Sequence, residues 1–251
     1  PEVTGTTRFS VTPAQDATYL AAAEKGDTKT AQRMVDRAAK KAENVIKASH
    51  GGRKGINVFD TVGQSDFGTH FTERRVIAEL FSQREEGEVT DAYLRLANPL
   101  RVHDLIRWNK ETIGKELVRL GHYKSMQGYG SAISSAVRKL EKREESEGSR
   151  TVEGRTVIKL RGWGKGRPTI REAIRSVLEG LGYDSLVYLN RRELVTDEGT
   201  IPASAWADAI LADRKKDVLS DAEFKANNPL ASETYVPLRP EQIKSADPIT
   251  R

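Results

Sequence analysis

Hydrophobic residues recur at helical spacing near the start of the chain. From 28 to 43, alanine, methionine and valine return every three or four positions on an otherwise charged segment, which predicts an amphipathic helix. Before it, the sequence TPAQ at 12–15 has an N-cap residue, proline at the first helical position and glutamine at the third, which predicts a helix to about Glu24. We therefore expect a helical segment over residues 1–43, serving as an appendage or a lid.

After residue 43 the pattern changes to short apolar runs, several of them separated by glycines. Such runs predict strands, which we expect at 45–48, 56–59, 67–71, 92–97, 156–160, 186–189 and 235–238. Periodic segments and capping boxes predict helices at 72–82, 110–120, 131–147, 169–179, 203–213 and 221–226. Strands scattered among helices, without regular alternation, predict an α+β domain over 44–251 with helical insertions near 110–150 and 194–228.

Composition narrows the chemistry open to this domain. The chain has no cysteine, which excludes disulfide frameworks, thiolate zinc sites and cysteine nucleophiles and suits a reducing cytoplasm. We predict no metal site, so the chemistry falls to histidines, carboxylates, hydroxyls and backbone. No apolar run approaches the length of a membrane span, and the first residues lack the apolar core of a secretory signal. We expect a cytoplasmic protein with no membrane contact.

Positive charge is concentrated in one stretch. The net charge is +5, and residues 150–175 hold eight Lys or Arg against Glu153 and Glu172. Such a stretch suits phosphate contacts with a polyanion, and a solvated surface is an equally good interpretation. Within it, RGWGKGRP at 161–168 resembles a dinucleotide-binding turn, but arginine replaces the third glycine. The acid expected about twenty positions further on would have to be Asp184, which precedes its strand. We therefore predict a basic loop there.

Five stretches together resemble the ADP-ribosyltransferase domains of phage polyvalent proteins and related bacterial effectors. They are SHGGRKGINVFDT, SDFGTHFTERRVIAELF, ANPLRVHDLIRW, GLGYDSLVYLN and YVPLRPEQIKSADPIT. The segment over 16–42 also resembles the helices that precede these domains. The resemblance implies an ADP-ribosyltransferase-like split β-sandwich, in which two small mixed sheets enclose an NAD cleft.

The resemblance assigns NAD-binding roles to two motifs. In the first, His50 would bond a ribose hydroxyl, and the backbone at Gly51 and Gly52 would meet the nicotinamide amide, with Phe59 following. Gly52 stands where relatives carry threonine. The second motif contributes Gly68, Thr69, Phe71 and Thr72 to the same site. A lone histidine is more often structural, so the role of His50 depends on the resemblance.

His70 occupies the position of an aromatic that stacks on nicotinamide in the diphtheria-toxin and poly(ADP-ribose) polymerase branch. A planar imidazole could stack there or donate a hydrogen bond, and a histidine packed at a sheet edge is the alternative. Loss of nicotinamide creates an oxocarbenium-like centre, which a nearby carboxylate favours. The resemblance offers Glu233, expected just before the last strand, as the first candidate and Glu193 as the second.

The function that this resemblance implies is NAD-dependent transfer of ADP-ribose to a macromolecule with release of nicotinamide. The acceptor is a nucleic acid or a protein, with arginine disfavoured because Ala231 replaces an acid or amide two residues before Glu233. A phage or conflict-system toxin with an inhibitor protein would suit this activity. One alternative is a catalytically inactive module that binds nucleic acid or protein. A third reading, a phosphotransferase, would need Arg53, Arg74 and Arg75 around a phosphate.

Overall fold

The computed structural model describes residues 13–41, 44–54, 67–84, 87–105, 107–152, 155–158, 169–197 and 220–246. The chain divides into two compact units. The first unit comprises Pro1–Asp104 and Asp184–Arg251, and the second comprises Leu105–Tyr183. The expected strand at 56–59 and helix at 203–213 lie outside the described residues.

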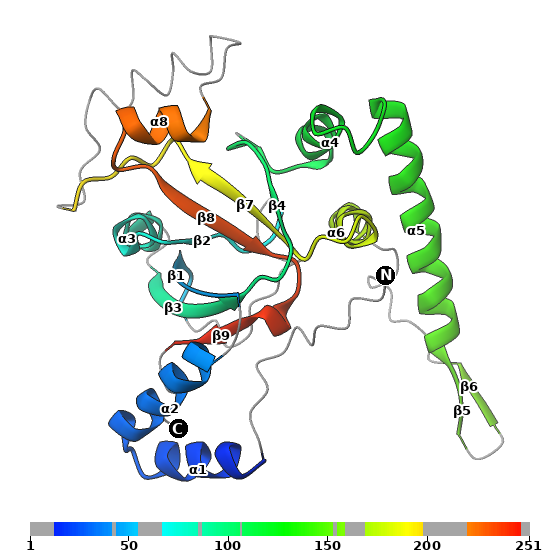
Figure 1. Cartoon of the computed structure of the whole chain (residues 1–251). Helices are drawn as coiled ribbons and strands as arrows, with labels where there is room; N and C mark the ends of the chain where they lie inside the picture. The colour runs from blue at the N-terminus through cyan, green and yellow to red at the C-terminus, as the bar shows by residue number, and fades with distance from the viewer. Residues whose placement is uncertain are drawn as a thin grey trace. The chain divides into compact units, whose positions relative to one another are not determined.

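The first unit is built on a seven-stranded mixed sheet (Figure 1). Its strands are β1 (Val45–Gly52), β2 (Phe71–Thr72), β3 (Glu88–Arg95), β4 (Pro99–Arg101), β7 (Ser185–Asn190), β8 (Ser232–Pro237) and β9 (Ile243–Ser245). They lie in the order β4-β7-β8-β2-β1-β3-β9, antiparallel except for the β4–β7 pair. The α+β prediction is confirmed. The resemblance implies two small sheets, whereas these strands form one sheet, with β2, only two residues long, as its middle strand.

Helices flank this sheet in the same unit. Helix α3 (Arg75–Arg84) packs on β1 and β3, α8 (Asp221–Asn227) precedes β8, and a 3-10 turn, η1 (Pro240–Gln242), leads into β9. The capping box predicted at the start of α8 is confirmed, because Ser220 and Glu223 bond each other's backbone N–H groups.

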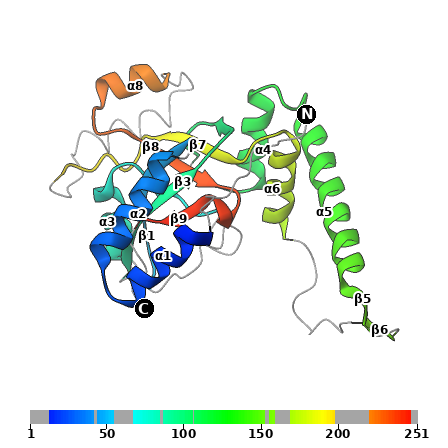
Figure 2. The same cartoon turned by 60° about the horizontal axis from the view of Figure 1, so that its bottom comes forward.

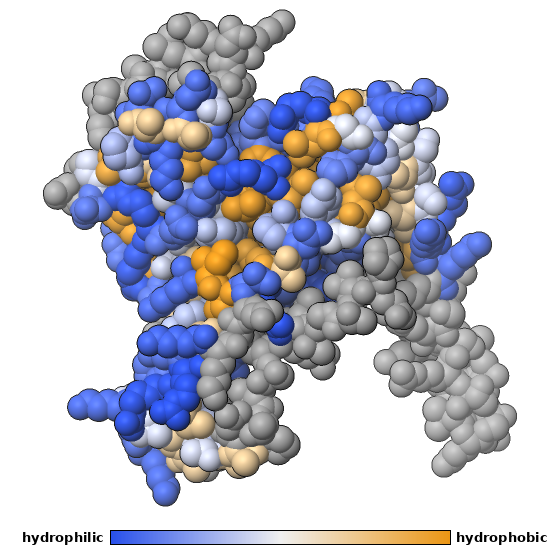
Figure 3. Space-filling view, viewed as in Figure 1, coloured by the Kyte–Doolittle hydropathy of each residue, from blue (hydrophilic) through white to orange (hydrophobic). Residues whose placement is uncertain are grey.

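The two N-terminal helices are α1 (Pro13–Glu24) and α2 (Thr28–Lys41), as the sequence predicts. The apolar stripe of α2 is buried at Ala31, Val35 and Ala39. Polar contacts fix α2 to the sheet: the Tyr93 hydroxyl donates to Asp36 at 2.8 Å, and Gln32 donates to the Ala246 carbonyl at 2.8 Å. Figures 1 and 2 both show α2 beside β9, and its visible outer side is hydrophilic in Figure 3. The helices therefore dock at the β3–β9 end of the sheet.

The second unit is mainly helical. It contains α4 (Lys110–Arg119), α5 (Met126–Gly148), α6 (Ile170–Gly180) and a hairpin of β5 (Ser149–Val152) with β6 (Arg155–Ile158). The capping box predicted for α6 forms between Thr169 and Glu172. A side chain at Gly114 would meet the ring of buried Tyr129 at 2.4 Å, so this glycine lets α4 and α5 pack closely.

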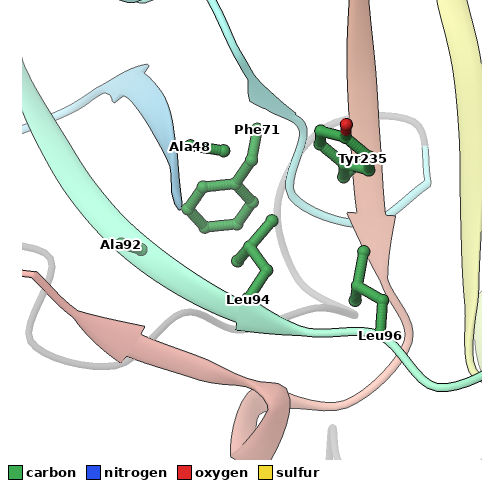
Figure 4. Close-up of a cluster of buried hydrophobic side chains, with 6 residues drawn as sticks. All are labelled: Ala48, Phe71, Ala92, Leu94, Leu96 and Tyr235. Atoms are coloured by element: carbon green, nitrogen blue, oxygen red, sulfur yellow. The ribbon is translucent and has the colours of Figure 1, made fainter. Parts of the chain in front are cut away.

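One face of the sheet in the first unit is apolar. Phe71 is fully buried there, and its ring packs among Ala48, Ala92 and Leu94, with Tyr235 and Leu96 alongside (Figure 4). We refer to this side as the apolar face. Since neighbouring residues of a strand point to opposite sides, residues one position away from these belong to the other face.

That other face carries a hydroxyl row, defined as Ser49, Thr72, Thr234 and Tyr188. These residues are direct cross-strand partners from four adjacent strands: Ser49 pairs with Thr72, Thr72 with Thr234, and Thr234 with Tyr188. All four are buried. The register of the sheet therefore aligns polar side chains that lie far apart in the sequence.

Several strand boundaries differ from the sequence prediction. Strand β1 extends through Gly52, so His50 lies within a strand and its two glycines do not form a turn. The segment 67–70 is irregular, and only Phe71–Thr72 pairs. Strand β8 begins at Ser232, so Glu233 is inside the strand and not before it.

Candidate functional site

Two of the expected site residues, His50 and His70, are linked at the residue that precedes β2. His70 directly precedes β2, and its Nδ1 lies 3.1 Å from the Tyr188 hydroxyl. The two rings contact edge to face, with 5.9 Å between their centroids. The backbone oxygen of His70 lies 2.9 Å from Nδ1 of His50. A carbonyl can only accept, so this nitrogen of His50 carries the proton. The structure thus brings His50 and His70 together.

The glycines of the first motif have identifiable structural reasons. A Cβ at Gly51 would lie 1.7 Å from the Ala78 carbonyl oxygen, so this glycine lets β1 approach the backbone of α3. A Cβ at Gly52 would lie 2.6 Å from Nε2 of His50. Any larger residue at 52 would therefore displace the imidazole. The glycine at 51 therefore lets β1 pack against α3, and the glycine at 52 leaves room for the imidazole of His50.

Two buried hydroxyls near this site lack hydrogen-bond partners in the described part of the chain. They belong to Thr69, which is 1% exposed, and to Ser232, which is 3% exposed. Ser232 is the cross-strand partner of Asn190 and lies on the same face as the hydroxyl row. Buried hydroxyls in folded proteins normally have partners. Unused hydrogen-bonding capacity at such positions is typical of a surface that receives a polar ligand.

The remaining residues of the second motif surround His70. Gly68 has a φ of 73°, a left-handed conformation that favours glycine, and it turns the chain into β2. Phe71 points into the apolar face, whereas Thr72 belongs to the hydroxyl row. Phe59, expected at the same site, lies outside the described residues.

Glu233 lies on the opposite side of the sheet from the hydroxyl row. Its cross-strand partner is Leu189, and it alternates with Thr234 along β8. Both its carboxylate oxygens accept from Arg101, at 2.7 and 2.9 Å. Burial raises the pKa of Glu233 and nearby Glu73 adds to this shift, while the Arg101 charge opposes it. Glu233 faces the same side of the sheet as Phe71 and Tyr235. His50 faces this side too, because it alternates with Ser49 along β1 and its ring centroid lies 5.5 Å from that of Phe71.

Glu193 follows β7 in a turn near Tyr188. Burial, with the charges of Asp104 and Glu193 adding to it, raises the pKa of Tyr188 well above its ordinary value. Both carboxylates therefore lie within electrostatic range of the Tyr188 hydroxyl, to which His70 is bonded. Of the two expected acids, Glu193 is the one whose charge adds to the pKa shift of Tyr188.

Asp104 is a further acid here that the sequence analysis did not single out. Its carboxylate accepts the backbone N–H of Arg191 at 2.9 Å. Burial raises the pKa of Asp104 to about 7, and the like charge of Glu193 adds to the shift against the opposing effect of the Arg191 hydrogen bond. Its position inside the motif ANPLRVHDLIRW was the available signal, since it is the motif's only acid.

A family model for the ADP-ribosyltransferase in polyvalent proteins matches residues 42–249. The chain belongs to this family. No curated protein and no solved structure gives a significant match. The match covers four of the five sequence stretches in full and the fifth except for its last residue. It begins after α2, so both N-terminal helices precede the matched region. The chain therefore carries a transferase domain of the ADP-ribosyltransferase type.

Two of the three arginines that a phosphotransferase would require are engaged elsewhere in this ADP-ribosyltransferase domain. Arg74 donates to the carbonyls of Val195 and Leu230, and Arg75 pairs with Asp91 at 2.7 Å. In the described ranges no group of three His, Asp or Glu side chains is placed to hold a metal ion. Nor does any described helix have the length and apolar character needed to cross a membrane.

Proposed function

We propose that this ADP-ribosyltransferase domain takes NAD as its donor, releases nicotinamide and transfers ADP-ribose to a macromolecular acceptor. The observation that carries the proposal is the linked pair His50–His70 bonded to Tyr188 at the end of the hydroxyl row. NAD presents ribose hydroxyls and phosphate oxygens, which suit the buried hydroxyls of Thr69 and Ser232.

Each part of the proposed site has a chemical role. His50, beside Gly51 and Gly52 at the end of β1, would bond a ribose hydroxyl. His70 would contact the nicotinamide from the next strand, with its ring orientation set by the Tyr188 hydroxyl. Gly68, Thr69, Phe71 and Thr72 would shape the wall on which His70 lies.

The departing nicotinamide leaves positive charge on the ribose, which a fixed carboxylate would stabilise. Of the two acids that the sequence offers, we propose Glu193 for this role. Its charge acts on Tyr188, next to His70, whereas both oxygens of the Glu233 carboxylate are held by Arg101. Glu233 would then stabilise the fold instead of the transition state.

The acceptor in this proposal is a nucleic acid or a protein. The basic stretch at 150–175 favours a nucleic acid, and its described part includes Arg171 and Arg175 on α6. A role as a phage or conflict-system toxin in the cytoplasm, controlled by an inhibitor protein, is compatible with either acceptor.

Nicotinamide release from NAD by the purified chain tests the proposal. Glu193→Gln should lower the rate by about 100-fold or more, because a charge that acts in the transition state is lost. Glu233→Gln is the matched control and should stay within about 10-fold of the parent rate, since it only weakens a pair with Arg101. A large loss in Glu233→Gln with an unchanged Glu193→Gln would reverse the assignment.

A catalytically inactive module that binds nucleic acid or protein is the second candidate. The observation that favours it is the Arg101 guanidinium, which bonds both oxygens of Glu233. Calorimetry with NAD separates the two candidates, because an enzyme must bind its donor. No heat of binding together with no nicotinamide release would reject the enzyme.

A further inference from the structure

Three side chain to backbone hydrogen bonds hold the turn after β7. Asn190 is buried, and its Oδ1 accepts the N–H groups of Arg192 and Glu193, each at 3.0 Å. An asparagine that bonds the backbone two and three residues ahead fixes the direction of a turn. The backbone of Glu193 is therefore anchored directly.

Asp104 completes the set. It accepts the N–H of Arg191 at 2.9 Å, although it lies 87 positions away in the sequence. Three consecutive backbone N–H groups, at 191, 192 and 193, thus each have a side-chain acceptor from Asn190 or Asp104. Regular secondary structure supplies none of these bonds.

The two ends of the turn are fixed as well. The Arg191 guanidinium pairs with Asp221 at 2.7 Å and lies 4.7 Å from the centre of the Phe224 ring. Beyond Glu193, Leu194 and Val195 are buried, and the Val195 carbonyl accepts from Arg74 at 2.6 Å. Glu193, which is partly exposed, stands between these two anchored ends.

We infer that Asn190 and Asp104 are positioning residues, which hold the backbone of residues 191–193 and so fix where Glu193 leaves the turn that follows β7. This inference rests on the proposed function of Glu193. Neither residue needs to touch the donor. Their effect is to remove conformational freedom from the acid before the reaction, and a displacement of about 1 Å at a reacting group can lower the rate about 100-fold.

A double-mutant cycle distinguishes positioning from general damage to the fold. Asp104→Leu and Asn190→Leu remove the acceptors and should each lower kcat for nicotinamide release about 10-fold to 100-fold, with KM for NAD within about threefold. Asp104→Asn keeps an acceptor oxygen for Arg191 N–H and should retain at least about a fifth of the parent kcat.

The decisive measurement introduces the same two leucine substitutions into the Glu193→Gln variant. If Asn190 and Asp104 act through Glu193, neither leucine variant should lower the residual rate by more than about twofold there. If a leucine variant lowered the rate of Glu193→Gln by the same factor as it lowers the parent rate, the inference would be wrong. Equal losses of kcat in Asp104→Leu and Asp104→Asn would also overturn it.

Amide hydrogen exchange of the unmodified chain supplies a readout that needs no activity and no variant. The N–H groups of residues 191–193 should exchange far more slowly than in an unstructured turn. Rapid exchange of all three would reject the inference even if nicotinamide is released. Slow exchange with no nicotinamide release would instead reject the proposed function, and with it any catalytic purpose for the turn.

Discussion

The two faces of the central sheet are built from the same strands and have opposite chemistry. On the apolar face, Phe71 and Tyr235 pack with Ala48 and Leu94. One residue further along, Thr72 and Thr234 belong to the hydroxyl row. A single sheet thus separates an apolar core from a row of buried hydroxyls.

The same comparison places Glu233 on the side of the sheet that His50 also faces, away from the hydroxyl row. Glu233 alternates with Thr234 along β8, so a carboxylate and a hydroxyl that are neighbours in sequence point to opposite sides. Glu193 lies outside the strands, and a hydrogen-bonded turn holds it near Tyr188. A residue's distance from a motif in the sequence is therefore a poor guide to whether it shares the site.

The largest effect expected from this comparison concerns Phe71, which is fully buried on the apolar face. Phe71→Ala should lower the free energy of unfolding by about 3–5 kcal/mol, because it leaves a cavity among packed side chains. Ser232→Ala is the matched change on the other face and should cost less than about 1 kcal/mol, since its hydroxyl has no partner in the described chain. Urea unfolding measures both. Equal losses would show that the two faces do not differ as described.

Asp104 gives the next largest effect, and it depends on pH. Its pKa is raised from 3.8 to about 7 by burial, so between these values the folded protein keeps a proton that the unfolded chain has released. Stability should therefore fall as pH rises from about 4 to about 7 and level off above it. Asp104→Asn cannot ionise, so it should gain up to about 4 kcal/mol relative to the parent between pH 4 and pH 8. Thermal unfolding at the two pH values checks this, and a constant difference would contradict the burial of a carboxyl there.

The sequence was sufficient for the helices whose signals are local. Each of the capping boxes that begin α6 and α8 spans only four residues of the chain, and both form as predicted. Helices α1 and α2 likewise follow from proline position and apolar spacing. Such elements depend on neighbouring residues, which the sequence shows directly.

The site itself depends on information that the sequence does not display. Strand β8 is buried on both faces, so its residues show no alternation from which the side of Glu233 could be read. Strands β4 and β9 have three residues each, too few for a period to appear. Asp104 reaches Arg191 only through the parallel pairing of β4 with β7. The histidine pair was found through resemblance, while the register that places it beside Tyr188 required the structure.

The two glycines of β1 give a smaller effect that separates structure from binding. Gly51→Ala should lower the free energy of unfolding by about 1–3 kcal/mol, because its methyl group would overlap the Ala78 carbonyl of α3. Gly52→Ala meets only the movable imidazole of His50, so it should cost less stability and weaken NAD binding instead. Denaturant unfolding and calorimetry with NAD give the two readouts. Equal stability with reduced binding in both variants would contradict the contact between β1 and α3.

The smallest effect lies at the junction of the hydroxyl row with the histidine pair. Tyr188→Phe removes the hydroxyl that lies 3.1 Å from Nδ1 of His70 and keeps the packed ring. A single hydrogen bond of this kind contributes about 0.5–1.5 kcal/mol, so the variant should unfold at nearly the parent urea concentration. If the hydroxyl orients His70 for the donor, NAD affinity should fall by about 3-fold to 10-fold, the range that this energy allows. Unchanged affinity in a stable Tyr188→Phe would place the donor away from His70, and the polar face would then serve the fold alone.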